Sequence, residues 1–600
     1  MSLQIDRRDL AFLLYEVLDV ATLPERPRFA GQGREVYDAV LDTLEGVAAE
    51  HYAPFRKAND QQEPALVDGR VITNPGLQQG WDAVAETGII AATHDEARGG
   101  MQLPHVIASA AIAFLEAANI GSASYPMLTA GAANLIAAFG SEAQRQRWLP
   151  RMLAGTWSGT MALTEPDAGS SLADLRTSAR PLPDGTYAIE GTKIWISGGD
   201  HQLTGNIVHL VLARIAGAPE GTKGISLFIV PRNTVAEDGT VGGSNHVTLA
   251  GLIHKMGWRG TTSTLLNFGE RGTCVGHLVG EPHKGLAYMF HMMNEARIGV
   301  GRAGAAMSYA AFRYAVEYAR TRRQGRVPGE KDPTRPPVAI VEHADIRRLL
   351  LTAKCAAEGS LALVLECARL VDEQETGATE AARQEAGLLL EVLTPIAKTW
   401  PAVYGQEGIS SALQVMGGYG YAREYDVEQL YRDNRLNQIH EGTNGIQALD
   451  LLGRKVPQAH GAAFALLGTR IAAAAREAAA ADPALAPLAQ QLGAALERMG
   501  AVTTRLLAAM AQEPARGLAN ATVYLECASR VVYAWLWLRQ ATVASRALAA
   551  GATGREADFY RGKLQAARFY FGQELPRTLA DADVLERNDA SAFEMQDAWF

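Results

Sequence analysis

Hydrophobic positions divide this 600-residue chain into stretches of two kinds. Through residues 34–160, and again from about residue 285 to the end, apolar side chains recur at helical spacing, which predicts amphipathic helices. Between them, short runs of β-branched residues bounded by Gly and Pro predict strands. These runs occupy residues 207–213, 225–230, 247–249 and 263–268. We therefore expect helices, then a small β-domain, then helices again.

The beginning of the chain predicts a short helix. Leu10, Leu13 and Leu14 recur at helical spacing after Asp6, which is a suitable cap residue. We expect this apolar strip to pack on the body of the protein rather than on a partner. The polar segment 57–64 and the proline-rich segment 327–337 predict loops, and the alanine-rich segment 471–481 predicts a further helix.

Composition narrows the class of protein. A hydrophobic fraction of 48% and a charged fraction of 20% are typical of a globular protein and exclude a disordered or fibrous chain. The net charge of −9, and the balance of 14 basic and 14 acidic residues in 461–600, argue against nucleic acid as a partner.

Cysteine usage and the apolar segments bear on the compartment. Four cysteines in so long a chain form no disulfide framework, which favours the reducing cytoplasm. The first residues lack the apolar run of a signal peptide. The longest charge-free stretch, about residues 120–141, contains Pro126 and many small polar residues, so we expect no membrane span there.

Two short motifs match the residue patterns of known sites without the structural context that those sites require. Gly299–Gly304 (GVGRAG) fits the dinucleotide fingerprint, but it lies inside a helix expected over residues 289–319, so we interpret its glycines as sites of close helix packing. Cys274, His277 and His283 lack a fourth ligand at a suitable spacing, so they imply no metal site.

Four separated segments carry a stronger signal. They are residues 163–170 (LTEPDAGS), 193–197 (KIWIS), 414–420 (QVMGGYG) and 431–447 (YRDNRLNQIHEGTNGIQ). In this order and at these separations, they resemble the acyl-CoA dehydrogenase family of flavoproteins over about residues 35–460. The opening segment and the long C-terminal block resemble the longer branch of that family, which includes 3-methylmercaptopropionyl-CoA dehydrogenases.

This resemblance implies an α+β multidomain fold. It would comprise an N-terminal helical domain, a small central β-domain (a barrel or sandwich), a C-terminal four-helix bundle and an extra C-terminal helical domain. The expected segments are 1–33 (an N-terminal helical extension), 34–158, 159–282, 283–460 and 461–600.

The resemblance also implies the reaction, which is α,β-desaturation of an acyl-CoA thioester with FAD as hydride acceptor. Glu441 would remove the α-proton, and Gly442 would allow a tight turn beside the thioester. The backbone N–H of Glu441, with a ribityl hydroxyl of the flavin, would bind the thioester carbonyl. Glu165 and Glu295 are the next candidates for the base.

Residues of the motifs would bind the ligands. The resemblance implies FAD contacts at Met161, Ala162, Leu163, Thr164, Ser170, Trp195, Ile196, Ser197, Arg322, Gln324, Gln414, Gly417, Gly418, Thr443 and Gly445. It implies substrate contacts at Ser170, Asn294, Arg297 and Gly442, with a surface salt bridge as the alternative role for Arg297.

The implied assembly is a homodimer or a dimer of dimers, with Arg322 and Gln414 acting across the interface, and the implied electron acceptor is electron-transfer flavoprotein. Alternatives are an acyl-CoA oxidase, a DNA-associated paralogue, which would need a basic C-terminal surface, and a flavin-free interaction protein. The length and substituent of the acyl chain, and the role of residues 461–600, stay open.

Overall fold

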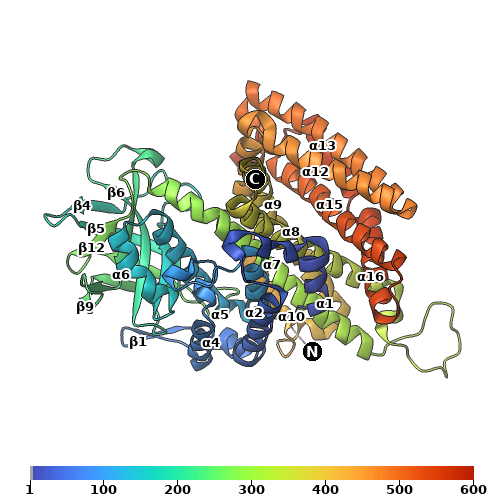
Figure 1. The fold of residues 1–600 in the computed structure, drawn as a ribbon, viewed down its shortest axis with the longest axis horizontal. Coiled ribbons are helices and arrows are strands. Elements are labelled where there is room, and N and C mark those ends of the chain that lie inside the picture. Colours follow the sequence, from blue (N-terminus) through green and yellow to red (C-terminus); the bar gives the residue numbers. More distant parts are fainter. Residues whose placement is uncertain (1–4) are drawn as a thin grey trace. The chain divides into compact units, whose positions relative to one another are not determined.

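The computed structural model describes residues 5–600, apart from the side chains of residues 291–293. The chain forms two compact units: one is Arg34–Ala296, and the other joins the described residues up to Gly33 to Arg297–Phe600. Figure 1 shows their helices and strands coloured along the chain. Helices, a central β-domain and then helices follow one another as expected, so the α+β multidomain class is confirmed.

The unit Arg34–Ala296 begins with helices. They are α2 (Arg34–Val47), α3 (Arg56–Gln61), α4 (Pro75–Thr87), α5 (His105–Phe139) and α6 (Glu142–Leu153), with a hairpin of β1 (Ala65–Val67) and β2 (Arg70–Ile72) between α3 and α4. The prediction of a loop over residues 57–64 is wrong, because most of this segment is α3. Two of its polar residues, Asn59 and Asp60, are buried, and the Asn59 amide donates to Ser122 Oγ at 2.9 Å.

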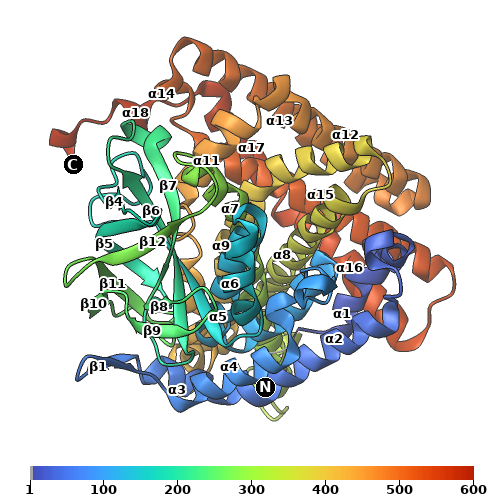
Figure 2. The same ribbon diagram turned by 60° about the vertical axis from the view of Figure 1, so that its left-hand side comes forward.

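The β-domain follows. Its strands are β3 (Trp157–Ala162), β4 (Ser178–Pro181), β5 (Tyr187–Ser197), β6 (Asn206–Ile215), β7 (Ile225–Pro231), β8 (Asn233–Val235), β9 (Val241–Ser244), β10 (Val247–Leu252), β11 (Ser263–Phe268) and β12 (Cys274–Leu278). The order in the main sheet is β10-β11-β5-β12-β7-β6-β3. Because β4 pairs with both β5 and β6, the strands β5, β12, β7, β6 and β4 close into a barrel-like ring without a free edge (Figure 2).

Helix α5 covers one face of this sheet together with α6. Their apolar side chains pack with those of β6 and β7 in one buried cluster that includes Ile136, Trp148, Leu210 and Ile229. Helix α5 is long and apolar enough to cross a membrane by length and composition, yet 94% of its most apolar window is buried inside the protein. Its apolar character is therefore explained by its position in the core of this unit.

The other unit is helical. Its helices are α1 (Arg7–Ala11), α7 (Gly285–Thr321, from Arg297 onward), α8 (Ala344–Thr376), α9 (Glu380–Met416), α10 (Val427–Leu436), α11 (Asn444–Asp450), α12 (Gln458–Ala481), α13 (Ala486–Gln512), α14 (Pro514–Gly517), α15 (Ala521–Ala549), α16 (Gly554–Gln573), α17 (Arg577–Arg587) and α18 (Ser591–Glu594). Asp6 caps α1 as predicted, since its side chain accepts from the N–H groups of Arg8 and Asp9. Helices α12 and α15 contact α9, and α15 and α16 contact α8 (Figure 1).

The GVGRAG segment lies inside α7, as the helix prediction requires. A Cβ added to Gly301 would stand 1.9 Å from the carbonyl oxygen of Ala397 in α9, and one added to Gly304 would stand 3.0 Å from Pro401. Glycine is therefore needed here because the two helices pack closely, not because a pyrophosphate approaches the backbone.

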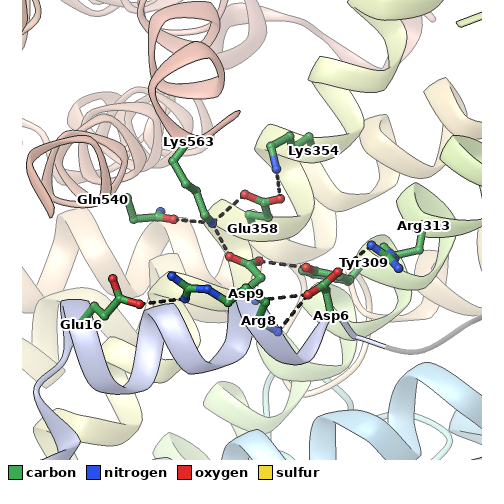
Figure 3. A network of polar contacts seen from close by, with 10 residues as sticks. All are labelled: Asp6, Arg8, Asp9, Glu16, Tyr309, Arg313, Lys354, Glu358, Gln540 and Lys563. Carbon is green, nitrogen blue, oxygen red and sulfur yellow. Dashed lines mark hydrogen bonds and ion pairs between the residues drawn. The ribbon is translucent and has the colours of Figure 1, made fainter. Parts of the chain in front are cut away.

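A buried group of charges joins the first helix to the C-terminal block (Figure 3). The Lys563 ammonium of α16 forms ion pairs with Asp9 of α1 and, at 2.7 Å, with Glu358 of α8. It also donates to Gln540 Oε1 at 3.0 Å, and Tyr309 OH donates to Asp9 Oδ2 at 2.9 Å. Burial and then the neighbouring Glu358 carboxylate raise the pKa of Asp9, so its ionised form depends on Lys563.

Replacing Lys563 is expected to destabilise the protein strongly. Lys563→Met would leave two buried carboxylates without their shared cation, a change that costs about 3–5 kcal/mol in comparable buried pairs. Arg561→Met is the matched control, because Arg561 lies in the same helix and pairs with Asp558 at an exposed site. Urea unfolding measures both variants, and a loss no larger than that of the control would contradict the role assigned to Lys563.

Candidate active site

The segment after α10 makes a tight turn at Glu441 and Gly442. Both residues have left-handed backbone conformations, with φ of +53° at Glu441 and +88° at Gly442. Glycine adopts this conformation readily, whereas glutamate does so at an energetic cost and only where its surroundings hold it. The turn therefore fixes the direction of the partly buried Glu441 side chain.

Two buried side chains hold the turn through its carbonyl groups. Gln447 Nε2 of α11 donates to the carbonyl oxygen of Glu441 at 3.0 Å. Lys398 Nζ of α9 donates to the carbonyl oxygen of Gly442 at 2.6 Å. Thr443 caps α11, with its side chain accepting from the N–H of Ile446. Successive carbonyls are thus bound by residues that lie far apart in the sequence.

Burial and the neighbouring positive charges shift the pKa of Glu441 in opposite directions. Burial raises the pKa of the Glu441 carboxyl, while Lys398 and then Arg297 act to lower it. Burial lowers the pKa of Lys398 to about 7, although the Glu441 carboxylate opposes this shift. His440 is neutral at physiological pH, because burial and then Lys398 lower its pKa to about 3. The carboxyl can therefore exchange a proton at a higher pH than an exposed glutamate does.

Arg297 is buried rather than at the surface. Its guanidinium NH1 donates to Asp450 Oδ2 at 2.7 Å, and Arg454 pairs with the other oxygen of Asp450 at 2.8 Å. The residue does form a salt bridge, but with only 4% of its side chain exposed. The Arg297 guanidinium is therefore paired with Asp450, and its positive charge still acts to lower the pKa of Glu441.

In the β-domain, the structure brings two of the sequence motifs together. The buried Lys193 of β5 donates to the carbonyl of Leu163 and to Glu165 Oε1, both at 2.9 Å. The N–H of Ile194 donates to the carbonyl of Thr164 at 3.0 Å. Burial acts to raise the pKa of Glu165, but the Lys193 ammonium lowers it, and the net shift is downward. Glu165 also accepts hydrogen bonds from the backbone N–H groups of residues 176 and 177. Glu165 thus has a structural role that explains its presence.

Trp195 is largely exposed. The pairing of β5 with β11 shifts register around it, and the resulting β-bulge places Trp195 at φ +62° with 56% of the residue exposed. Three other predicted residues of these motifs are partly buried: Met161, Thr164 and Ser197. By contrast, the side chains of Ala162 and Ile196 pack in the core. Only the backbone of these last two residues can face a ligand.

A third group of predicted residues lies at the end of α9. Gln414, Gly417 and Gly418 are exposed, and a Cβ added to either glycine would meet no atom within 4 Å. The Arg322 guanidinium lies over the ring of Tyr419, 5.7 Å from its centroid. Arg322 and segment 414–420 therefore lie close together in the same unit, and the uncrowded backbone of Gly417 and Gly418 belongs to the same segment as Tyr419, which Arg322 contacts.

The remaining predicted residues are more scattered. Ser170 and Gln324 are exposed, Asn294 is partly buried, and Gly445 lies in the first turn of α11. Glu295, the third candidate base, is exposed and accepts from the amide of Asn134 at 2.7 Å.

Sequence reasoning missed Lys398 and the role of Gln447. A signal for Lys398 is present in the sequence, because it is the only charged residue in the otherwise apolar helical run 392–402. A buried charge in such a run indicates a specific partner. Its partner is 44 residues away, at Gly442, and no local pattern reveals it.

Four family models match this chain in order. They are the acyl-CoA dehydrogenase N-terminal domain (residues 35–156), middle domain (160–270) and C-terminal domain (283–456), and an acetyl-CoA dehydrogenase C-terminal-like domain (467–596).

Relatives match over nearly the whole length. A 3-methylmercaptopropionyl-CoA dehydrogenase of Ruegeria pomeroyi is 36% identical over 97% of both chains. A butyryl-CoA dehydrogenase of Syntrophomonas wolfei is 33% identical over 99% of this chain and 98% of its own. The structure of a Bacillus anthracis acyl-CoA dehydrogenase complexed with FAD has the same fold, with a TM-score of 0.74 and 20% identity over 98% of this chain and 93% of its own. The chain therefore belongs to the acyl-CoA dehydrogenase family, whose members are FAD-dependent oxidoreductases.

Proposed function

We propose that this chain desaturates an acyl-CoA thioester between its α- and β-carbons, with Glu441 as the base. The observation that carries this proposal is the rigid turn at Glu441–Gly442, which presents a carboxyl of raised pKa. A carboxyl in such surroundings suits removal of a weakly acidic proton. FAD, when bound, supplies the acceptor for the hydride that leaves the β-carbon.

The residues present fit a flavin. Trp195 offers an exposed aromatic face, and Met161–Thr164 and Ser197 would contribute partly buried backbone and hydroxyl groups beside it. The open glycine pair at 417–418 and the nearby Arg322 suit a pyrophosphate, because backbone and cation are both accessible there. The other proposed FAD residues are Ser170, Gln324, Gln414, Thr443 and Gly445.

The chain itself would carry out the proton chemistry. Glu441 would accept the α-proton, so that its carboxyl is protonated when the double bond forms. Among the described residues, the backbone N–H of Glu441 has no acceptor, so it is available to donate to the thioester carbonyl and stabilise the developing enolate-like charge. Glu165 is a weaker candidate for the base, because its oxygens are engaged by Lys193 and two backbone N–H groups.

Names of relatives support the substrate class that we propose. The substrate would be a 3-methylmercaptopropionyl or a short straight-chain acyl thioester, and Asn294, Arg297 and Ser170 would lie near its CoA. Electron-transfer flavoprotein would take the electrons. We further propose a cytoplasmic homodimer or dimer of dimers, and the five-segment domain organisation expected from the sequence.

Replacing the base is expected to abolish flavin reduction without loss of FAD. Glu441→Gln keeps the size of the side chain but cannot accept the proton, so bleaching of the visible flavin band by substrate should slow by about 10²–10⁴-fold. Glu295→Gln is the comparison: it removes another candidate base, which is exposed and bonded to Asn134, and it should keep the wild-type rate. A Glu441→Gln enzyme that reduces its flavin within several-fold of the wild-type rate would exclude Glu441 as the base.

The pH profile should report the raised pKa of Glu441. The base acts in its ionised form, so kcat/KM should fall as pH drops through the pKa of Glu441, at a value above the usual 4.5. Steady-state rates with saturating electron acceptor, measured across the acid range, locate this limb. A limb at or below the usual value would argue that burial does not control the base.

A panel of thioesters tests the proposed substrate class. The panel contains 3-methylmercaptopropionyl-CoA, butyryl-CoA and longer straight-chain acyl-CoAs, assayed with an artificial electron acceptor. We expect the highest kcat/KM with one of the first two. Preference for a long chain would contradict the substrate class while leaving the reaction in place.

A further inference from the structure

Four lysine side chains are buried among the described residues, and one of them differs from the others. Three form ion pairs with carboxylates: Lys193 with Glu165, Lys455 with Glu391, and Lys563 with Glu358 and Asp9. Lys398 forms no such pair within residues 5–600, and instead donates to the carbonyl of Gly442 at 2.6 Å. A buried ammonium group is costly unless a charge of opposite sign lies near, so this position calls for an explanation.

We propose that Lys398 is the positioning residue of the base: its ammonium group fixes the Gly442 carbonyl and favours the ionised, proton-accepting form of Glu441. This inference rests on the proposed role of Glu441. Lys398 touches the turn rather than the reacting atoms, so it acts through Glu441.

The geometry supports the positioning part of this role. Glu441 and Gly442 hold two successive left-handed conformations, of which the first is unfavourable for glutamate. Gln447 binds the carbonyl of Glu441 and Lys398 binds the carbonyl of Gly442, so each peptide group of the turn is held by one buried side chain. Of these two side chains, only Lys398 carries a charge.

The surrounding charges support the electrostatic part. Lys398, from α9, opposes the rise in the pKa of Glu441 more strongly than Arg297, from α7, does. Arg297 is already paired with Asp450 of α11, which reduces its field at Glu441. His440, from the loop before the turn, is neutral because burial lowers its pKa. Lys398 is therefore the cation on which the ionisation of Glu441 chiefly depends.

Three variants test whether the charge of Lys398 controls Glu441. Lys398→Met removes both the charge and the donor, Lys398→Gln removes the charge but keeps a donor, and Lys398→Arg keeps both. Lys455→Met is the matched control, because it removes another buried ammonium that bonds to Glu391 outside the turn. Thermal unfolding and the visible spectrum establish that each variant folds and retains FAD.

Two measurements then report on Glu441. One is the acid limb of kcat/KM, and the other is the infrared C=O stretch of the protonated Glu441 carboxyl, identified by its loss in Glu441→Gln. For Lys398→Met and Lys398→Gln we expect the midpoint of the acid limb and that of the infrared titration to rise by about one pH unit. At pH values below the limb, kcat/KM would then be about tenfold lower than in the wild type. For Lys398→Arg and Lys455→Met we expect the wild-type midpoints.

Unchanged midpoints in Lys398→Met and Lys398→Gln would overturn the inference. If Lys398→Met does not fold, the same measurements on Lys398→Gln decide the question. The infrared titration follows the carboxyl without turnover, so it tests Lys398 even if Glu441→Gln still reduces its flavin and the proposed base is wrong. A shift of equal size in Lys455→Met would show a general effect of buried charge and would also overturn it.

Discussion

An ammonium group in the interior must be matched by a negative charge or by carbonyl oxygens, and this constraint organises both units of the molecule. Lys563 requires Asp9 and Glu358, which draws the first helix and the C-terminal block onto α8. Lys193 requires Glu165 and the carbonyl of Leu163, which joins two motifs of the β-domain. Each lysine connects segments that are distant in sequence, so burial of the charge fixes long-range geometry that apolar contacts alone leave adjustable.

The two motifs proposed for chemistry share a backbone feature. Glu441 and Trp195 both have positive φ although neither is glycine, at +53° and +62°. Each is held by its surroundings: Glu441 by side-chain donors on the turn that contains it, and Trp195 by the bulge between β5 and β11. Conformations of this kind persist only where neighbouring groups over-determine them, and they concentrate at functional sites. Rigid presentation of a side chain is what both positions have in common.

The sequence predicted the helices and the main strands well, because apolar periodicity directly reflects which face of an element is buried. It also predicted that Gly301 and Gly304 serve helix packing, since their position inside a helix excludes a phosphate loop. It failed at residues 57–64, where the polar residues Asn59 and Asp60 are buried in a helix. The closed ring made by β4, the burial of Arg297 and the bond from Lys398 to Gly442 were not predictable either. These depend on which distant groups meet, and local patterns carry no information on that.

The burial of α5 has a consequence for synthesis of the chain. This helix is complete at Phe139 and contacts β3, which ends at Ala162, but the strands β6 and β7 that share its buried apolar cluster end only at Pro231. At ribosomal rates, the intervening roughly 90 residues take about 5–20 s to emerge. During that interval a helix with the length and apolar character of a membrane span lacks the two strands that complete its buried cluster. We therefore expect the nascent chain to expose apolar surface of α5 until β7 has left the ribosome.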